Sequence, residues 1–449
     1  MSRGNKLRAV FYVCGVASIG LVNREVHADE QTDIRQELLL LRQQNQALQQ
    51  QLRRQQNLID SLSEKVTEIQ ATSLQSSYEV DRLKVEFENN GQEPGKTSSF
   101  SLGQVRLSGE GGVGFFHSGS QGAFPNAEFR ADEIKLFVDA PIWGDVYFFT
   151  ELNLITREAP DLSLHLGEAY LEFENVSRLW NWDRVVSIRA GRMDIPFGEE
   201  YMFRDAIDNP LISHSLSDIW GVDEGLELYG AAGKFGYVVA VQNGGPSGNR
   251  DFEADKSIAG RVSFDPARWL HLSASGMRTG DLKLPNDYWS ELWFGNGWVL
   301  PLGSTNMTKF HAELVEGDVV LRLPQVQVKA FGGLLHYDDN DPAGNNSRDV
   351  YYYSVEASHD FSRKFYAAVR FSQMFADKGF PIAANGDINH YLFSGLLTEE
   401  IWRLSLGLGY RWNQNFLLKT EYSFEQGKVL GGGERDHEDL VAVEAAFKF

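Results

Sequence analysis

The hydrophobic positions of this 449-residue chain follow two different periods. Apolar residues first recur at spacings of three and four, beginning with Ile34, Leu38 and Leu41 and continuing to Phe87. This is the heptad seam of a coiled coil. From residue 100 onward the period is two, in segments of roughly ten residues between turn clusters, which is typical of strands. The chain therefore divides into a helical N-terminal part and a β-rich remainder.

The heptad pattern predicts a coiled coil over residues 29–90. Asn45 falls on an a position and Gln55 on a d position of the seam. Polar residues at such positions fix the register and the oligomeric state at some cost in stability. The seam is compatible with a dimer and with a trimer. Pro94 and its neighbouring glycines then end the helix, so residues 91–99 form a linker.

The first 28 residues have the features of a secretory signal peptide. Three basic side chains precede the apolar stretch 9–22, and Val26-His27-Ala28 provides a cleavage site. The chain's single cysteine, Cys14, lies within that stretch. The mature protein is therefore expected to be exported and to contain neither disulfides nor reactive thiols.

The alternating segments after residue 100 predict a membrane β-barrel. In residues 402–411, Trp402, Leu404 and Leu406 alternate with Arg403 and other polar or small residues. Throughout this region one face is charged and the other is apolar and often ends in an aromatic residue. A soluble β-sandwich also alternates, but a wet charged lumen and an aromatic-girdled lipid face fit the pattern better. We predict an all-β transmembrane antiparallel barrel of about 16 strands over residues 100–449.

The loop lengths and the last strand support this prediction. Long loops at 196–223, 280–307 and 337–349 alternate with tight turns, as they do when the two membrane sides receive different connections. The chain ends on the alternating segment VAVEAAFKF, whose final residue is Phe449. This ending is similar to that of bacterial outer-membrane barrels, which implies that the barrel-assembly machinery recognises Phe449.

Several segments resemble the phosphate-selective porin O and P family. They are EIKLFVDAPIWGDVYFFTELNL (133–154), GEAYLEFEN (167–175), SIRAGRMDIPFGEEY (187–201), GLELYGAAGKFGYVVAVQNG (225–244) and AGRVSFDP (259–266). The resemblance extends over residues 100–449 and leaves out the coiled coil. It implies a sixteen-stranded outer-membrane porin, commonly a homotrimer, whose anion selectivity comes from basic side chains that line the pore.

The charge balance disagrees with the last of these implications. The chain has a formal net charge of -20, and residues 97–449 contain 30 Lys and Arg against 49 Asp and Glu. A narrow pore with a strongly negative field attracts cations and repels phosphate. We therefore carry over the fold and the pore function but not the anion selectivity.

The strand alternation assigns charged side chains to the lumen. The predicted lumen cations are Lys135, Arg189, Arg192, Arg261, Lys329, Arg370, Arg403, Arg411 and Lys419. The predicted lumen anions are Glu133, Glu151, Glu168, Glu172, Glu227, Glu313, Glu356 and Glu421. Opposed basic and acidic walls would set a transverse field that selects solutes. Alternatively, these charges pair with one another and only keep the pore hydrated.

A long segment after the best family motif is a candidate constriction loop. It covers residues 196–221, and its charged side chains are Glu199, Glu200, Arg204, Asp205 and Asp208. The loop could fold into the pore and narrow it, or remain outside the barrel. Sequence alone leaves both positions open.

No sequence motif supports catalysis or a bound metal. The chain contains no G-x-S-x-G, H-E-x-x-H, P-loop or Cys/His cluster, so we expect no enzymatic activity, no metal and no cofactor. The acidic balance argues against nucleic acid as a partner. The first functional hypothesis is a passive outer-membrane channel for small polar or ionic solutes. The second is a structural anchor whose periplasmic coiled coil spaces or tethers the membrane from the cell wall.

Overall fold

The structure is a computed structural model, and it describes residues 105–157, 164–246, 251, 254–303, 306–342 and 344–449, with the backbone of 100–102. The predicted signal peptide (1–28), coiled coil (29–90) and linker (91–99) lie outside the described residues. The predictions made for these three segments therefore stay predictions.

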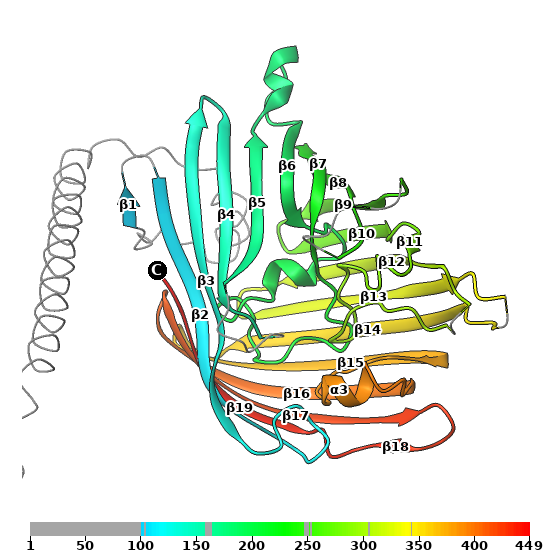
Figure 1. Cartoon of the computed structure of the whole chain (residues 1–449). Helices are drawn as coiled ribbons and strands as arrows, with labels where there is room; N and C mark the ends of the chain where they lie inside the picture. The colour runs from blue at the N-terminus through cyan, green and yellow to red at the C-terminus, as the bar shows by residue number, and fades with distance from the viewer. Residues whose placement is uncertain are drawn as a thin grey trace, which may run out of the picture. The chain divides into compact units, whose positions relative to one another are not determined.

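The predicted barrel is confirmed: sixteen antiparallel strands form one sheet that closes on itself (Figure 1). Closure is made by the last strand, which pairs with the first from Leu440↔Ser118 to Lys448↔Glu110. The barrel strands are β2 Val105–Ser118, β3 Glu128–Trp143, β4 Val146–Ile155, β5 His165–Phe173, β6 Ser187–Asp194, β7 Val222–Ala232, β8 Phe235–Gln242, β9 Ser257–Ala267, β10 Leu270–Arg278, β12 Lys309–Arg322, β13 Val326–Asp339, β14 Arg348–Asp360, β15 Phe365–Phe380, β16 Thr398–Asn413, β17 Phe416–Val429 and β19 Leu440–Lys448.

Smaller elements extend or connect these strands. Three short strands pair with the edges of longer ones, and three short helical turns lie in connections. They are β1 Phe100–Leu102, β11 Leu282–Lys283, β18 Glu434–Arg435, η1 Val176–Trp180, η2 Glu200–Phe203 and α3 Ile388–Tyr391. Among the described residues, no helix combines the length and apolar character needed to cross a membrane.

The two faces of the strands differ as their alternation predicts. On β17, the side chains of Lys419, Glu421 and Glu425 are buried inside the barrel, whereas Tyr422 and Phe424 lie exposed on the outside. Charged groups are stable inside because they reach partners across the lumen, and apolar groups outside fit a hydrocarbon solvent. The barrel therefore has a charged interior and an apolar outer surface.

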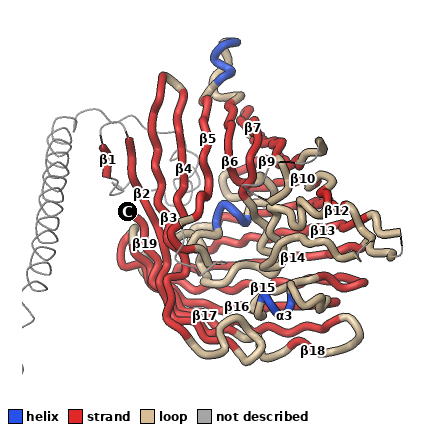
Figure 2. The backbone as a smooth tube through the Cα atoms, viewed as in Figure 1, coloured by secondary structure: helices blue, strands red, loops and turns tan. Residues whose placement is uncertain are grey.

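One end of the barrel has tight turns and the other has long loops. At this end the last residues of β3 and β16 and the turns after β9 and β14 expose aromatic side chains, which form a girdle: Trp143, Trp412, Trp269 and Phe361. Phe449 lies at this end, where its backbone bonds with Gly109 of β2. At the opposite end, loops fold back across the space that the strands enclose (Figure 2).

These loops build an apolar core within part of the lumen. Phe294, from the loop after β11, packs against Tyr352 of β14 at 5.6 Å and Phe380 of β15 at 5.7 Å between ring centroids. Ile195 and Leu216, from the connection between β6 and β7, belong to the same buried cluster. The loop end of the barrel is therefore filled on the side of β12 to β15.

Candidate functional site: a loop clamped inside the lumen

The connection between β6 and β7, residues 195–221, lies inside the ring of strands. Tyr366 Oη on β15 donates a hydrogen bond to Pro210 O at 3.0 Å. Leu211 packs in a buried cluster with Tyr366 and Leu417, which point inward from β15 and β17. We call this segment the constriction loop, because it occupies part of the space that the strands enclose.

Lys419 of β17 holds the constriction loop by three carbonyl groups. Its Nζ donates to the carbonyl oxygens of Ala206 at 2.6 Å, Asn209 at 3.3 Å and Leu211 at 2.9 Å. The same ammonium lies 2.9 Å from the carboxylate of Glu444 on β19. Lys419 was predicted as a lumen cation, and its side chain does lie on the inward face of β17, with its donors directed at the loop backbone.

Two arginines on neighbouring strands act in the same way. Arg370 Nη1 donates to Ser213 O at 2.7 Å, and Arg403 Nη1 donates to His214 O at 2.9 Å. Each guanidinium is also neutralised by a carboxylate on an adjacent strand, since Arg370 pairs with Glu356 and Arg403 pairs with Glu425. Their charges are therefore balanced within the wall.

Wall carboxylates complete the clamp by accepting hydrogen bonds from loop amides. Glu421 Oε2 accepts from the backbone N–H groups of Ile212 and Ser213, the latter at 2.8 Å. Glu133 of β3 accepts from the N–H of Ala206 on the opposite side of the loop. Charge-assisted hydrogen bonds of this kind contribute about 1.5–3 kcal/mol each. The loop is consequently held from both sides of the lumen.

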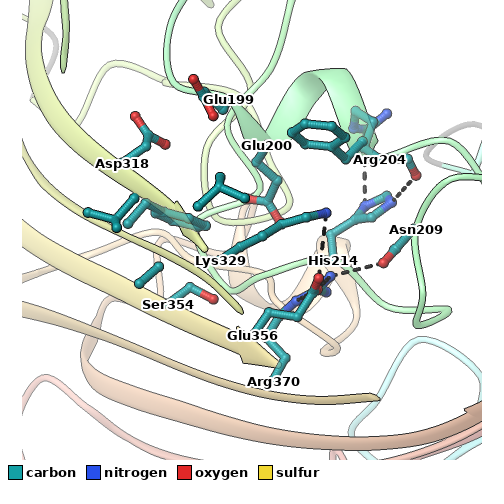
Figure 3. Close-up of a pocket in the computed structure, with 15 residues that line it drawn as sticks. Glu199, Glu200, Arg204, Asn209, His214, Asp318, Lys329, Ser354, Glu356 and Arg370 are labelled. Carbon is teal, nitrogen blue, oxygen red and sulfur yellow. Dashed lines mark hydrogen bonds and ion pairs between the residues drawn. The ribbon is translucent and has the colours of Figure 1, made fainter. Parts of the chain in front are cut away.

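A cavity remains between the constriction loop and the wall formed by β12 to β15. Figure 3 shows Lys329 and Arg370 converging on Glu356, with Glu200 of the loop nearby. Lys329 Nζ lies 3.6 Å from Glu356 and 4.1 Å from the ring centroid of Phe203. Both signs of charge line this cavity, together with apolar side chains such as Phe203 and Phe331.

A buried charge cluster fixes the far end of the loop. Arg204 lies 4.1 Å from the ring centroid of Trp220 and 3.4 Å from Asp218. Burial opposes the charge on Asp218, but His214 and Arg204 hold the pKa of its carboxyl below the usual value. Burial lowers the pKa of His214, and Arg204 and Arg157 lower it further, although Asp218 opposes the change.

The β2–β4 side of the lumen is acidic. Carboxylate oxygens of Glu110, Asp205 and Asp208 all lie within 4.8 Å of one another. Lys135 of β3 pairs with Asp205 and interacts electrostatically with Glu110 and Glu151 as well. The constriction loop thus presents two of its predicted acids, Asp205 and Asp208, to a wall that is itself acidic.

Other charged residues predicted for the lumen or its loop form ion pairs or hydrogen bonds with neighbouring strands and loops. Arg189 lies between the rings of Tyr170 and Tyr229 and pairs with Glu227 at 3.1 Å and Glu172 at 3.6 Å. Arg261 donates a hydrogen bond to the carbonyl oxygen of Gly198, and Glu168 accepts one from the backbone N–H of Asp194. The carboxylate of Glu199 is hydrogen-bonded to the His271 ring, and Arg411 forms an ion pair with Asp360.

Two predicted lumen positions are wrong. Arg192 follows the inward Arg189 by an odd number of residues, so the alternation places it on the outer side of β6, where it pairs with Glu224 at 3.0 Å. Glu313 lies between the inward Ala312 and Leu314 of β12 and is exposed on the outside. In both cases the strand phase was misassigned near the loop end.

Arg157 is a clamp residue that the sequence patterns did not identify. It donates to Ile212 O at 2.7 Å and pairs with Asp132 and Glu444. Arg157 follows the end of β4, so it belongs to no alternating segment. Asp132 adjoins a bulge in the pairing of β2 with β3, which obscures the period of two there.

No protein-family model matches the chain, and a search of curated proteins finds no match. Solved structures do resemble it. OmpT, an outer membrane protein of Vibrio cholerae, superposes with a TM-score of 0.51 at 10% identity, covering 79% of this chain and 100% of that one. The outer membrane channel DcaP of Acinetobacter baumannii gives 0.50 at 13% identity, with coverage of 78% and 99%. The chain shares the β-barrel fold of these outer-membrane proteins.

Proposed function

We propose that this chain is an outer-membrane porin that allows small polar or ionic solutes to diffuse through its lumen, and that it is not an enzyme. The observation that carries this proposal is the clamped constriction loop. A closed barrel with a charged interior provides the passage, and a loop bonded to the wall from both sides sets its width. The fold shared with the outer membrane channel DcaP agrees with this role.

The charges around the loop favour cations. On the β13–β17 side, Lys419, Arg370 and Arg403 are neutralised by wall carboxylates and bonded to loop carbonyls. On the β2–β4 side, Asp205 and Asp208 face further acids, with Lys135 as their basic neighbour. A passage along that side has a negative field, which raises the local concentration of cations and lowers that of anions.

Phosphate selectivity, which the family resemblance implies, has weak support. Anion binding in a pore requires basic groups whose donors point at the solute. Here Lys419 directs its donors at three loop carbonyls, and Arg370 and Arg403 are each shared between a carboxylate and the loop. The residual affinity of these groups for an anion is therefore low.

The proposed setting follows from the two ends of the barrel. Short turns face the periplasm in bacterial barrels, so the coiled coil predicted before β1 would lie in the periplasm. We propose that the protein assembles as a homotrimer in outer-membrane lipid and that Phe449 is read by the barrel-assembly machinery. A tether to the cell wall through the coiled coil is the second proposed role, and it rests on the heptad pattern alone.

Planar-bilayer recording of the purified protein tests the channel proposal. A porin produces discrete conductance steps, and liposomes that contain it swell in small neutral solutes but not in large ones. An inserted barrel that gives no steps and no swelling would contradict the proposal and favour a purely structural role.

A further inference from the structure

The connection between β5 and β6 differs from every other described turn at its end of the barrel. It has 13 residues, 174–186, whereas the turns after β3, β7, β9, β12, β14 and β16 have two to four residues. It contains the 3₁₀ turn η1, and in Figure 1 it extends past the end of the β3–β4 hairpin. A long ordered segment on the turn side requires a reason, because short turns suffice to connect strands.

This turn has a fixed shape. Ser177 is fully buried, and its hydroxyl accepts hydrogen bonds from the N–H groups of Val185 at 3.0 Å and Val186 at 3.2 Å. Asn175 Oδ1 accepts from the N–H of Arg184 at 2.7 Å. The backbone of Glu174 also donates to Asp145 O at 2.8 Å, which joins this turn to the β3–β4 turn. The side chains at its tip are therefore presented in a defined arrangement.

The tip exposes large apolar side chains. Leu179 is 80%, Trp180 61% and Trp182 62% exposed. Ile142 and Trp143, at the end of β3 beside it, are 59% and 80% exposed. Large apolar side chains that are exposed together in water favour association with another surface. Trp143 is also a member of the aromatic girdle, at the rim of the surface that the proposed function assigns to lipid.

A polar concavity lies beside Trp182. Arg178 and Arg184 line it together with the carboxylates of Asp145, Glu174 and Asp183. Arg178 and Asp145 are 3.5 Å apart and both largely exposed, so this pair is weak and can open toward another partner. The concavity therefore offers cationic and anionic groups side by side, which complements a ligand that carries both an anion and a cation.

We propose that this turn docks on the periplasmic leaflet of the outer membrane and binds the headgroup of a zwitterionic phospholipid. Leu179, Trp180 and Trp182 enter the interface between headgroups and acyl chains, where Trp and Leu are favoured. The lipid phosphate binds Arg178 and Arg184. The lipid ammonium binds the carboxylates of the concavity, those of Asp145, Glu174 and Asp183. The proposal rests on the outer-membrane location proposed above.

Site-specific spin labelling of the full-length protein in phosphatidylethanolamine-containing nanodiscs tests the docking. The sole cysteine, Cys14, is in the predicted signal peptide, so single cysteines can be added to a mature chain without others. Leu179→Cys is compared with Leu408→Cys on the outer face of β16 and Arg363→Cys in the exposed β14–β15 turn. The measured quantity is the ratio of the label's collision rate with oxygen, which concentrates in lipid, to its collision rate with a water-soluble nickel chelate. We expect this ratio to be several-fold higher at position 179 than at position 363.

The controls separate the possible failures. If the label at 179 is as accessible to the chelate as the label at 363, while that at 408 is shielded, the docking proposal is overturned and the membrane barrel stands. If the label at 408 is also aqueous, the membrane location itself is wrong. Protection of position 179 by peptidoglycan sacculi and not by lipid would equally overturn the proposal, in favour of a glycan partner.

Headgroup preference is tested with Glu174→Gln in the same nanodiscs, because this carboxylate lines the concavity and only phosphatidylethanolamine carries an ammonium for it. Wild type is expected to retain phosphatidylethanolamine over phosphatidylglycerol in native mass spectrometry by several-fold, and Glu174→Gln to lose most of that preference with conductance unchanged. Equal retention of both lipids by the wild type would overturn the headgroup assignment.

Discussion

Replacing Lys419 by methionine tests whether the wall holds the constriction loop. The substitution keeps the length and apolar stem of the side chain but removes the donor to Ala206, Asn209 and Leu211. Glu444 would retain Arg157 at 3.6 Å as its remaining basic neighbour among the described residues. Breaking one partner of a buried ion pair costs about 3–5 kcal/mol. We expect a loss of about 3 kcal/mol in the free energy of unfolding.

The same substitution should change the pore. Without Lys419 the middle of the loop keeps Glu421 but loses its other charged contact with β17, so the loop fluctuates and the passage widens. Single-channel recording should show a larger and noisier conductance, and chemical unfolding should show the stability loss. Arg411→Met is the matched control, since Arg411 pairs with the exposed Asp360 and a surface pair contributes roughly 0–1 kcal/mol.

A double variant separates stability from gating. In Lys419→Met with Glu444→Leu, the buried carboxylate is also removed, and replacement of both partners by apolar side chains is often neutral for stability. Unfolding should return toward the wild-type value, while the conductance stays high because the loop carbonyls still lack their donor. Unchanged conductance and stability in Lys419→Met would refute the clamp.

Three further outcomes are expected. Asp205→Asn with Asp208→Asn should reduce the ratio of cation to anion permeability several-fold in reversal-potential measurements, and an unchanged ratio would place the ion path elsewhere. Because burial lowers the pKa of His214, protonation favours states in which its ring is solvated. The loop should therefore lose stability as the pH falls below about 6.5, seen as more frequent conductance fluctuations that are absent in His214→Gln. Deletion of Phe449 should lower the yield of folded barrel in the outer membrane, measured by heat-modifiable gel migration, without loss of the exported chain.

The strands were predictable because their environment imposes a period of two. Polar and apolar side chains must alternate along a strand that has water on one side and an apolar solvent on the other. On β17, for example, Glu421 faces the lumen and Tyr422 faces outward. The count of sixteen follows from the same signal. The predicted inward position was wrong for Arg192 and Glu313, which lie near the loop end of the barrel. Outward residues there need not be apolar, so inward and outward positions cannot be told apart by polarity.

The constriction loop shows where sequence reasoning stopped. Its charges identify it as a candidate, but its position depends on contacts with residues some 200 positions away, such as the 208 positions between Glu421 and Ser213. Arg370 and Lys419 were correctly placed on inward faces. Besides a wall carboxylate, each also binds carbonyl groups of the loop, and backbone acceptors leave no trace in the amino-acid sequence.

The reversal potential of single channels in a potassium chloride gradient tests the central claim most directly. The wild-type protein should show a clear preference for potassium over chloride, which weakens at high ionic strength because salt screens the carboxylates. A preference for chloride, or for phosphate over potassium when phosphate replaces chloride, would contradict an acidic passage beside a clamped loop.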